Sequence, residues 1–460
     1  MQHTATVSQR SWSIPGWLPA VILLLVTIAI GPSLGSLSRP LFVLACGAAG
    51  WYAWRCGAAA HLQTAIILFT FAPMARRIVD LSVGYDDSSL MLVGPLFALL
   101  APVPQLRRLL EGNQSLGAQS TPMLIVAGCI LYTTMLTVFQ GEWMQAASGV
   151  LKWGVPMLYA AAIGLSADRD EMVQAAASAF VVILPITGVI GLVQYVDPQP
   201  WDRYWMQFAP IMSAGQPIPF GVRTFSSMNG PASFATFTAV GLLLVCFLRP
   251  RAYVLLLAIP AALAFFLSLY RTAWMMLALG IVFCLMFATT RVRAGVILLG
   301  LVAAVVIAAV ATPFGEVIAD RLGTLTEVSG DDSAEERLDQ FLMLWNMPDS
   351  SLFGSGFTTS DVGTAGTMAI DGMIIACWLM MGMVVGMICL SALVWTAVNA
   401  IGAAWRDPRP EAIMVGALGC TALLQLPLAN LTAGEFGFLF WTFAVLATLP
   451  PRANAQHGVP

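Results

Sequence analysis

The chain has 460 residues, of which 58% are hydrophobic and only 10% are charged, and its formal net charge at pH 7 is -3. About a quarter of the residues in soluble domains are charged, so this composition excludes a soluble fold. All eight cysteines lie inside or beside apolar runs, so we expect no disulfide framework.

Several apolar runs reach the roughly 20 residues that a helix needs to cross about 30 Å of hydrocarbon. They predict an all-α fold, a polytopic transmembrane helical bundle of about 12–14 spans. The expected spans, in chain order, are 16–35, 40–55, 60–75, 87–104, 121–140, 144–166, 172–195, 229–248, 252–269, 272–289, 294–312, 369–403, 412–430 and 435–450. The third run is short for a span, and the long run 369–403 is expected to begin as a helix outside the bilayer.

Arginine indicates the orientation, because short cytoplasmic connections collect positive charge. With the N-terminus inside, the inner turns carry most of the arginines, among them Arg55, Arg169 and Arg409. Both termini are then cytoplasmic in a multi-pass protein of the bacterial inner membrane. The expected organisation is transmembrane helices over 1–312 with a periplasmic loop at 196–228, a large periplasmic loop at 313–368, C-terminal transmembrane helices over 369–450 and a cytoplasmic tail at 451–460.

The two long loops carry their own structural signals. The first holds four aromatic residues among prolines, which predicts packing against the membrane surface; they are Trp201, Tyr204, Trp205 and Phe208. In the second, Ser333 and Glu336 form a capping box. Apolar residues then follow at helical spacing, which predicts an amphipathic helix on the outer leaflet; they are Leu338, Phe341, Leu342 and Trp345.

Arginines on the outer side are exceptions to the expected charge distribution, and Arg271 is the clearest. It lies in the middle of about 40 otherwise apolar residues, a length that fits a helical hairpin with Arg271 at its tip. An arginine at that depth is costly unless it is paired or reaches water. It either anchors the tip by snorkelling or binds an anion, because a planar guanidinium holds phosphate oxygens bidentately.

Arg223 precedes the expected span 229–248, in the run Phe220-Gly221-Val222-Arg223-Thr224-Phe225-Ser226-Ser227-Met228-Asn229-Gly230-Pro231. Asn229 suits the N-cap of that helix and Pro231 suits its first turn. The free N–H groups of the helix N-terminus and Arg223 would together suit an anion. Ordinary capping, with Arg223 at the lipid headgroups, is the alternative.

Two other charged positions leave two interpretations open. Arg337 could join an anion site or form a surface salt bridge with its acidic neighbours. Asp371 begins a span, where a desolvated carboxylate could be a general base or simply an N-cap.

The remaining charged clusters favour structural explanations. Arg76 and Arg77, with nearby aspartates, are best explained as an ion-pair cluster in an outer turn. The three histidines, His3, His61 and His457, are all cytoplasmic in this topology. We therefore expect no metal site and no histidine base in the outer loops.

These residues resemble the O-antigen polymerase and O-antigen ligase superfamily of bacterial polysaccharide assembly. The resemblance rests on the run 223–231, on Leu269-Tyr270-Arg271-Thr272-Ala273-Trp274, and on the large loop with Arg337, Trp345 and Gly354-Ser355-Gly356, followed by Asp371-Gly372. It covers roughly 200–390. It implies a glycosyltransferase that needs no metal or other cofactor and takes a glycan from undecaprenyl diphosphate on the periplasmic side.

The resemblance also implies roles for individual residues. Arg223, Arg271 and Arg337 would bind the diphosphate, and Asp371 would be a candidate base, with Asn229, Tyr270 and Trp345 in support. Ligases of the superfamily use a histidine where this chain offers Asp371, which favours a polymerase of O-antigen or exopolysaccharide repeats.

Several functions and partners stay open at this stage. A ligase that transfers glycan to lipid A core or protein is one alternative, and a transporter or flippase of lipid-linked glycan is another. The expected partners are the lipid-linked glycan, the bilayer and a candidate chain-length regulator, and no nucleic acid.

Overall fold

The computed structural model describes residues 14–111, 116–209, 212–311, 342, 350–357 and 372–449. Within these ranges the chain is helical and contains no sheet, apart from one isolated bridge between Gly215 and Val222. The helices are α1 (Leu18–Ile30), α2 (Ser38–Cys56), α3 (Ala58–Val83), α4 (Val93–Ala98), α5 (Arg107–Leu110), α6 (Ser120–Phe139), α7 (Trp143–Gly149), α8 (Val155–Gly164), α9 (Arg169–Val196), α10 (Pro200–Phe208), α11 (Pro231–Leu248), α12 (Ala252–Leu267), α13 (Arg271–Leu285), α14 (Arg291–Ala311), α17 (Ser350–Phe353), α18 (Met373–Arg406), α19 (Pro410–Gln425) and α20 (Gly434–Thr448).

Seven helices in the described part of the chain are long and apolar enough to cross a membrane, which indicates a multi-pass membrane protein. They are Leu18–Cys56, Ala58–Val83, Gly117–Phe139, Trp143–Gly164, Arg169–Val196, Pro231–Leu248 and Met373–Arg406. A bent pair, Leu90–Ala98 and Val103–Leu109, would make an eighth if it forms one broken span. The prediction of an all-α membrane protein is therefore confirmed at this level.

Each of the fourteen apolar runs overlaps helix among the described residues, but several differ from simple spans. The third is longer than expected, because α3 continues to Val83. α12, α13, α19 and α20 have between 10 and 17 residues each, which is shorter than a typical span. Within Leu18–Cys56, α1 and α2 pack side by side, because Gly35 in the connection takes a φ of 62° and turns the chain.

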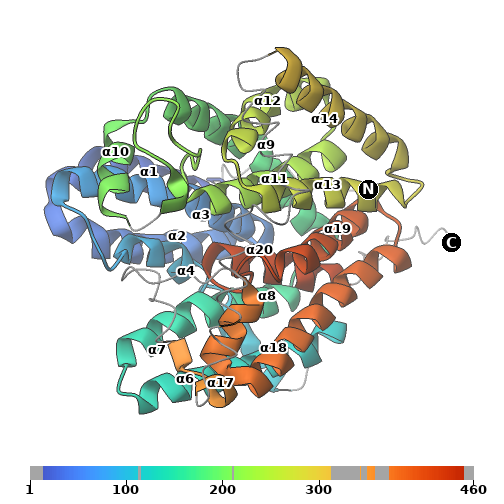
Figure 1. Cartoon of the computed structure of the whole chain (residues 1–460). Helices are drawn as coiled ribbons and strands as arrows, with labels where there is room; N and C mark the ends of the chain where they lie inside the picture. The colour runs from blue at the N-terminus through green and yellow to red at the C-terminus, as the bar shows by residue number, and fades with distance from the viewer. Residues whose placement is uncertain are drawn as a thin grey trace, which may run out of the picture.

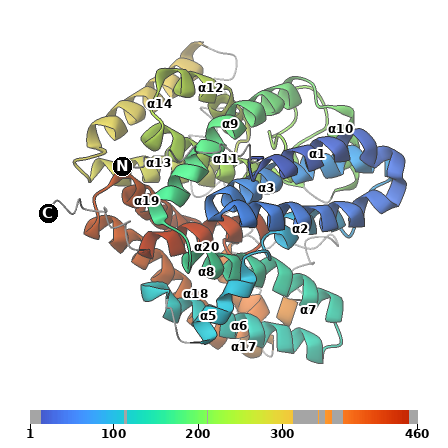
Figure 2. The ribbon, with the colours of Figure 1, turned by 180° about the vertical axis from the view of Figure 1, so that it is seen from behind.

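The core lies around α11, whose apolar stretch is 83% buried, whereas that of α1 and α2 is only 22% buried. The largest buried cluster joins α11 to α3, α9, α12, α13, α19 and α20. Figures 1 and 2 show α1 and α2 on one side of the bundle and α6, α7 and α17 on another, with α11 and α20 between them.

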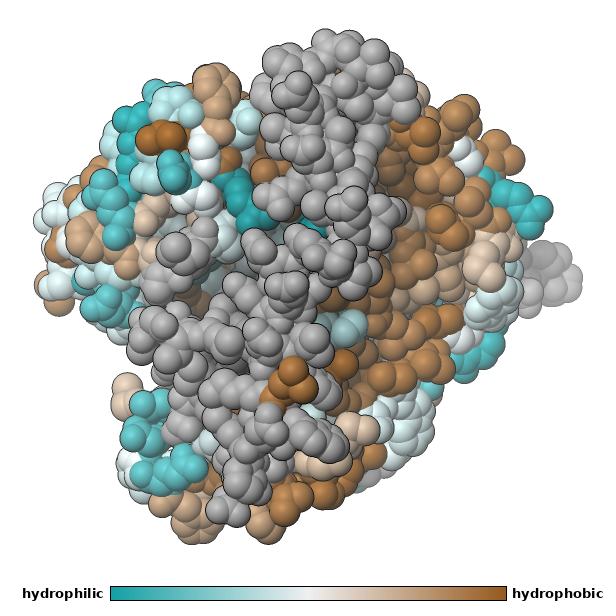
Figure 3. All heavy atoms as spheres, in the orientation of Figure 1, coloured by the Kyte–Doolittle hydropathy of each residue, from teal (hydrophilic) through white to brown (hydrophobic). Residues whose placement is uncertain are grey.

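Hydrophobic side chains gather on the face that carries α14 (Figure 3), where Val292, Val296 and Leu299 are exposed. Such a surface suits lipid rather than water.

A short segment, 350–357, packs against a break in α18. Gly382 inside α18 has a φ of 78° that interrupts the helix, and a Cβ there would lie 2.3 Å from the carbonyl oxygen of Leu352. The main-chain N–H of Ser355 donates to the carbonyl of Leu379 at 2.8 Å, and its hydroxyl donates to the same oxygen at 2.9 Å. Gly354 thus allows a close backbone contact with α18, and Gly356 allows one with Thr137 of α6. The amphipathic helix expected around Ser333 lies outside the described residues.

Candidate functional site

Arg223 lies in an irregular segment, 212–230, that forms hydrogen bonds with the turn between α12 and α13. Its main-chain N–H donates to the carbonyl of Ala214 at 2.9 Å, next to the Gly215–Val222 bridge. Its guanidinium donates to the carbonyl of Leu269 at 3.0 Å and to that of Ser213 at 3.3 Å. Arg223 therefore lies against the tip of the hairpin that α12 and α13 form.

The hairpin tip carries Arg271, as the sequence predicts. Leu269 has a φ of 52°, which turns the chain sharply, and Tyr270 precedes α13 as its N-cap in an extended conformation. Arg271 is the first residue of α13 and is half-buried. A cation at a helix N-terminus is disfavoured, because the helix dipole is positive there. The Arg223 guanidinium and the positive end of α13 thus lie at one turn, next to Arg271 in the chain, where an anion would be stabilised.

Buried polar contacts hold the segment after Arg223 in place. Ser226 has a φ of 52°, and its hydroxyl donates to the carbonyl of Thr187 in α9 at 2.6 Å. The side-chain oxygen of Gln194, also in α9, accepts from the main-chain N–H groups of Phe225 at 2.9 Å and Ser226 at 2.8 Å. These bonds fix the backbone path between Arg223 and the start of α11.

Arg77 reaches the same segment from α3 and is fully buried. Its guanidinium donates to the carbonyls of Ser226 and Met228 and forms an ion pair with Asp202 of α10 at 2.9 Å. It also stacks on Phe225, with its carbon 4.9 Å from the ring centroid. The prediction that Arg77 belongs to an ion-pair cluster in an outer turn is wrong, because α3 extends past it and turns its side chain inward.

Arg76, by contrast, does belong to an ion-pair cluster. It pairs with Asp80 at 3.1 Å and donates to the carbonyl of Asp86 at 2.7 Å. Arg39 of α2 pairs with Asp80 as well, at 3.0 Å. This cluster fastens α2, α3 and the following turn beside the segment that Arg77 holds.

Asp202 belongs to α10, the helix that replaces the irregular loop expected after residue 196. Desolvation by burial raises the pKa of this carboxyl, and the Arg77 guanidinium acts in the opposite direction. Trp205 of the same helix is buried and packs on Phe225, whereas Phe208 is exposed. Of the four aromatic residues expected at the membrane surface, Trp205 thus packs inside the protein.

The start of α11 differs from the sequence prediction in one respect. Pro231 occupies the first turn as expected, but the N-cap is Gly230, and no side chain caps the helix. Asn229 therefore does not act as the cap. Its Oδ1 and the hydroxyl of Ser227 are buried without a hydrogen-bond partner among the described residues. Because buried polar atoms are normally paired, both have capacity for a bound water or a polar ligand.

A carboxylate that the sequence analysis did not single out lies at the same end of α11. Glu435 is in the first turn of α20, and its Oε1 accepts a 2.6 Å hydrogen bond from the Ser233 hydroxyl of α11. In the sequence, Glu435 is the first residue of an expected span, because an apolar run follows it directly. A small cavity of about 40 Å³ lies among α11, α13, α19 and α20. Its lining includes Thr236, Met276, Gln425 and Phe436.

The described residues thus bring together some of the expected site residues. Arg223, Tyr270 and Arg271 meet at the hairpin tip, and Asn229 lies in the segment that follows Arg223. Arg337, Trp345 and Asp371 lie outside the described residues. Gly372 is the N-cap of α18, and the next N–H donates to the carbonyl of Leu426, in the turn that leads to α20. In the ranges that the structure covers, no group of three or more His, Cys, Asp or Glu could hold a metal ion.

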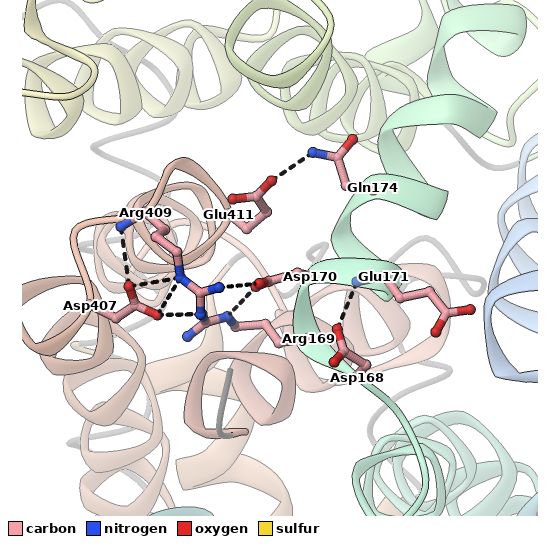
Figure 4. A network of polar contacts seen from close by, with 8 residues as sticks. All are labelled: Asp168, Arg169, Asp170, Glu171, Gln174, Asp407, Arg409 and Glu411. Carbon is pink, nitrogen blue, oxygen red and sulfur yellow. Dashed lines mark hydrogen bonds and ion pairs between the residues drawn. The ribbon is translucent and has the colours of Figure 1, made fainter. Parts of the chain in front are cut away.

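A second polar network lies at the opposite end of α9 (Figure 4). Arg169 pairs with Asp407 at 2.5 Å, and Arg409 pairs with Asp407 at 2.8 Å and with Asp170 at 2.7 Å. Hydrogen bonds from Arg409 and Arg169 hold the pKa of the Asp407 carboxyl well below its usual range. Gln174 extends the network by donating to Glu411 at 2.7 Å. The network joins the first turn of α9 to the α18–α19 connection, far from Arg223.

No known family matches the sequence of this chain, and no curated protein matches it either.

Proposed function

We propose that this protein is a membrane glycosyltransferase that polymerises undecaprenyl-diphosphate-linked oligosaccharide repeats of an O-antigen or exopolysaccharide. The reaction takes place at the periplasmic face of the bacterial inner membrane. The observation that supports this proposal most directly is the hydrogen bond from Arg223 to Leu269, two residues before Arg271. This hydrogen bond holds the Arg223 guanidinium, a donor for a diphosphate, at the hairpin tip.

The chemistry of the transfer explains why such donors are useful. An acceptor hydroxyl attacks the anomeric carbon of the donor glycan, and undecaprenyl diphosphate leaves. Negative charge therefore grows on the diphosphate as the bond breaks, and fixed donors at that position stabilise the transition state. Guanidinium groups suit this role, because each can bind two phosphate oxygens at once. The N-terminus of α13 adds N–H groups and a positive dipole end.

The membrane arrangement is part of the proposal. About 12–14 spans hold the site in the bilayer that supplies the lipid substrate, and the loop 313–368 lies in the periplasm with Arg337. Both termini are cytoplasmic. The network of Arg169 and Arg409, at the far end of α9, is then on the cytoplasmic side, as the positive-inside rule expects. A chain-length regulator is a candidate partner.

The proposal can be tested with Arg223→Ala and Arg271→Ala in a deletion strain of the native bacterium. Each variant should reach the membrane in normal amount, lose long-chain glycan and accumulate single lipid-linked repeats. Arg203→Ala is a matched control, because Arg203 is a partly exposed arginine of α10 that pairs with the exposed Asp197. It should leave chain length unchanged.

Other outcomes would favour other functions. Accumulation of long lipid-linked chains would indicate a ligase, and retention of lipid-linked repeats on the cytoplasmic side would indicate a flippase. Normal chain length in both arginine variants would refute the diphosphate site.

A further inference from the structure

We propose that Glu435 is the proton acceptor for the hydroxyl that attacks the donor glycan, and that Ser233 positions its carboxylate. This inference rests on the proposed function. Ser233 is the third residue of α11, so its contact with Glu435 lies at the end of α11 that follows the Arg223 segment. The base and the diphosphate donors therefore belong to one end of the bundle.

The small cavity is lined by the two helices that carry Arg271 and Glu435. Met276, in its lining, follows Arg271 by five residues in α13, which is about 7.5 Å along a helix axis. Phe436, also in the lining, is the direct neighbour of Glu435 in α20. Arg271 and Glu435 thus each belong to a helix that lines this cavity, within two helical turns of a lining residue.

The chemical surroundings of Glu435 differ from those of other carboxylates at this end. Four of those carboxylates form ion pairs with arginine; they are Asp80, Asp86, Asp197 and Asp202. Among the described residues Glu435 forms no ion pair, and its Oε1 accepts a hydrogen bond from a neutral hydroxyl. An arginine partner would hold a carboxylate in its ionised form and weaken it as a base. The Ser233 hydroxyl bonds Oε1 of Glu435, which is one of its two carboxylate oxygens.

In the proposed step, the free oxygen of Glu435 takes the proton of the acceptor hydroxyl while that hydroxyl oxygen bonds to the anomeric carbon. The bond from the anomeric carbon to the diphosphate oxygen breaks, and the electron pair leaves with undecaprenyl diphosphate, beside Arg223 and Arg271. The products are the elongated glycan, undecaprenyl diphosphate and a protonated Glu435, which then loses its proton to water.

The test uses the full-length protein in lipid nanodiscs with the single lipid-linked repeat extracted from the deletion strain as substrate. Glu435→Gln keeps the size of the side chain and an oxygen that accepts from Ser233, so it should fold normally. We expect kcat to fall by about 10²–10⁴-fold, the usual contribution of a general base, with KM nearly unchanged. The rise of kcat with pH on the acid side should disappear as well. Glu435→Asp should retain part of the activity, and Ser233→Ala should lower kcat less than Glu435→Gln.

Glu142→Gln is the matched control, because Glu142 is an exposed carboxylate just after α6. It should keep wild-type kcat and the wild-type pH profile. If Glu435→Gln keeps kcat within about threefold of wild type and an unchanged pH profile while wild type elongates the substrate, this inference is wrong and the proposed function stands. If wild type itself does not elongate the substrate, the proposed function fails, and this inference fails with it. Thermal unfolding of each variant shows whether a loss of rate has a folding cause.

Discussion

Arg77 provides the sharpest test of how the Arg223 segment is held. Substituting Arg77→Met keeps much of the side-chain volume but removes every donor. Asp202 then loses its ion-pair partner, and the carbonyls of Ser226 and Met228 lose their donors. Removing one partner of a buried ion pair costs about 3–5 kcal/mol, because the other charge stays buried. Each buried carbonyl left unpaired adds about 1–3 kcal/mol, reduced where the backbone relaxes.

We therefore expect Arg77→Met to lower the free energy of unfolding by at least about 4 kcal/mol. Removing both charges in Arg77→Met/Asp202→Leu should restore about half of that loss, because no unpaired charge remains. Arg203→Met is the control, since Asp197 is exposed and Arg203 is partly exposed, and ion pairs near the surface contribute about 0–1 kcal/mol. The measurement is reversible unfolding in mixed micelles. A single variant within about 1 kcal/mol of wild type, or a double variant less stable than the single, would refute this account.

Three further changes test other parts of the fold. Gly382→Ala places a Cβ 2.3 Å from the carbonyl oxygen of Leu352, so segment 350–357 should detach from α18 and become sensitive to limited proteolysis. Gly300→Ala is the control, because a Cβ at Gly300 meets no atom within 4 Å, and it should not change the cleavage rate. Gly188→Ala places a Cβ 2.2 Å from the main-chain nitrogen of Ala261; it should separate α9 from α12 and cost about 1–3 kcal/mol in thermal unfolding. Asp407→Asn should destabilise the protein by about 1–3 kcal/mol at pH 7. Because the folded-state pKa of Asp407 is lowered, this difference in stability from wild type should persist down to about pH 4 and shrink only below it. A difference that grows on acidification would contradict the ion-pair assignment.

Local patterns predicted the helices well where an apolar run alone decides them. The run 172–195 became α9 with nearly the expected bounds, and the run 229–248 became α11, which starts at Pro231. Such runs depend only on neighbouring residues. Helix ends were less predictable, because Gly230 rather than Asn229 is the N-cap of α11.

Contacts between distant segments could not be predicted from the sequence. Arg77 looked like a member of a surface cluster, since its aspartate neighbours in sequence are close, yet its partner is Asp202 on another helix. Glu435 looked like the first residue of a span, because its neighbours in the sequence do not indicate that Ser233 is its partner. Arg223 and Arg271 were singled out by local signals, since Arg271 interrupts an apolar region and Arg223 precedes the start of a helix, and their role stays a prediction.

The break in α18 has a consequence for how the chain is built into the membrane. A carbonyl left unpaired in hydrocarbon costs several kcal/mol, and the carbonyl of Leu379 at the break is satisfied by Ser355, from outside the helix. α18 is therefore complete as a membrane element only after segment 350–357 has docked. Because this segment precedes α18 in the chain, it leaves the ribosome first and is available when α18 arrives. The order of synthesis thus matches the order of assembly.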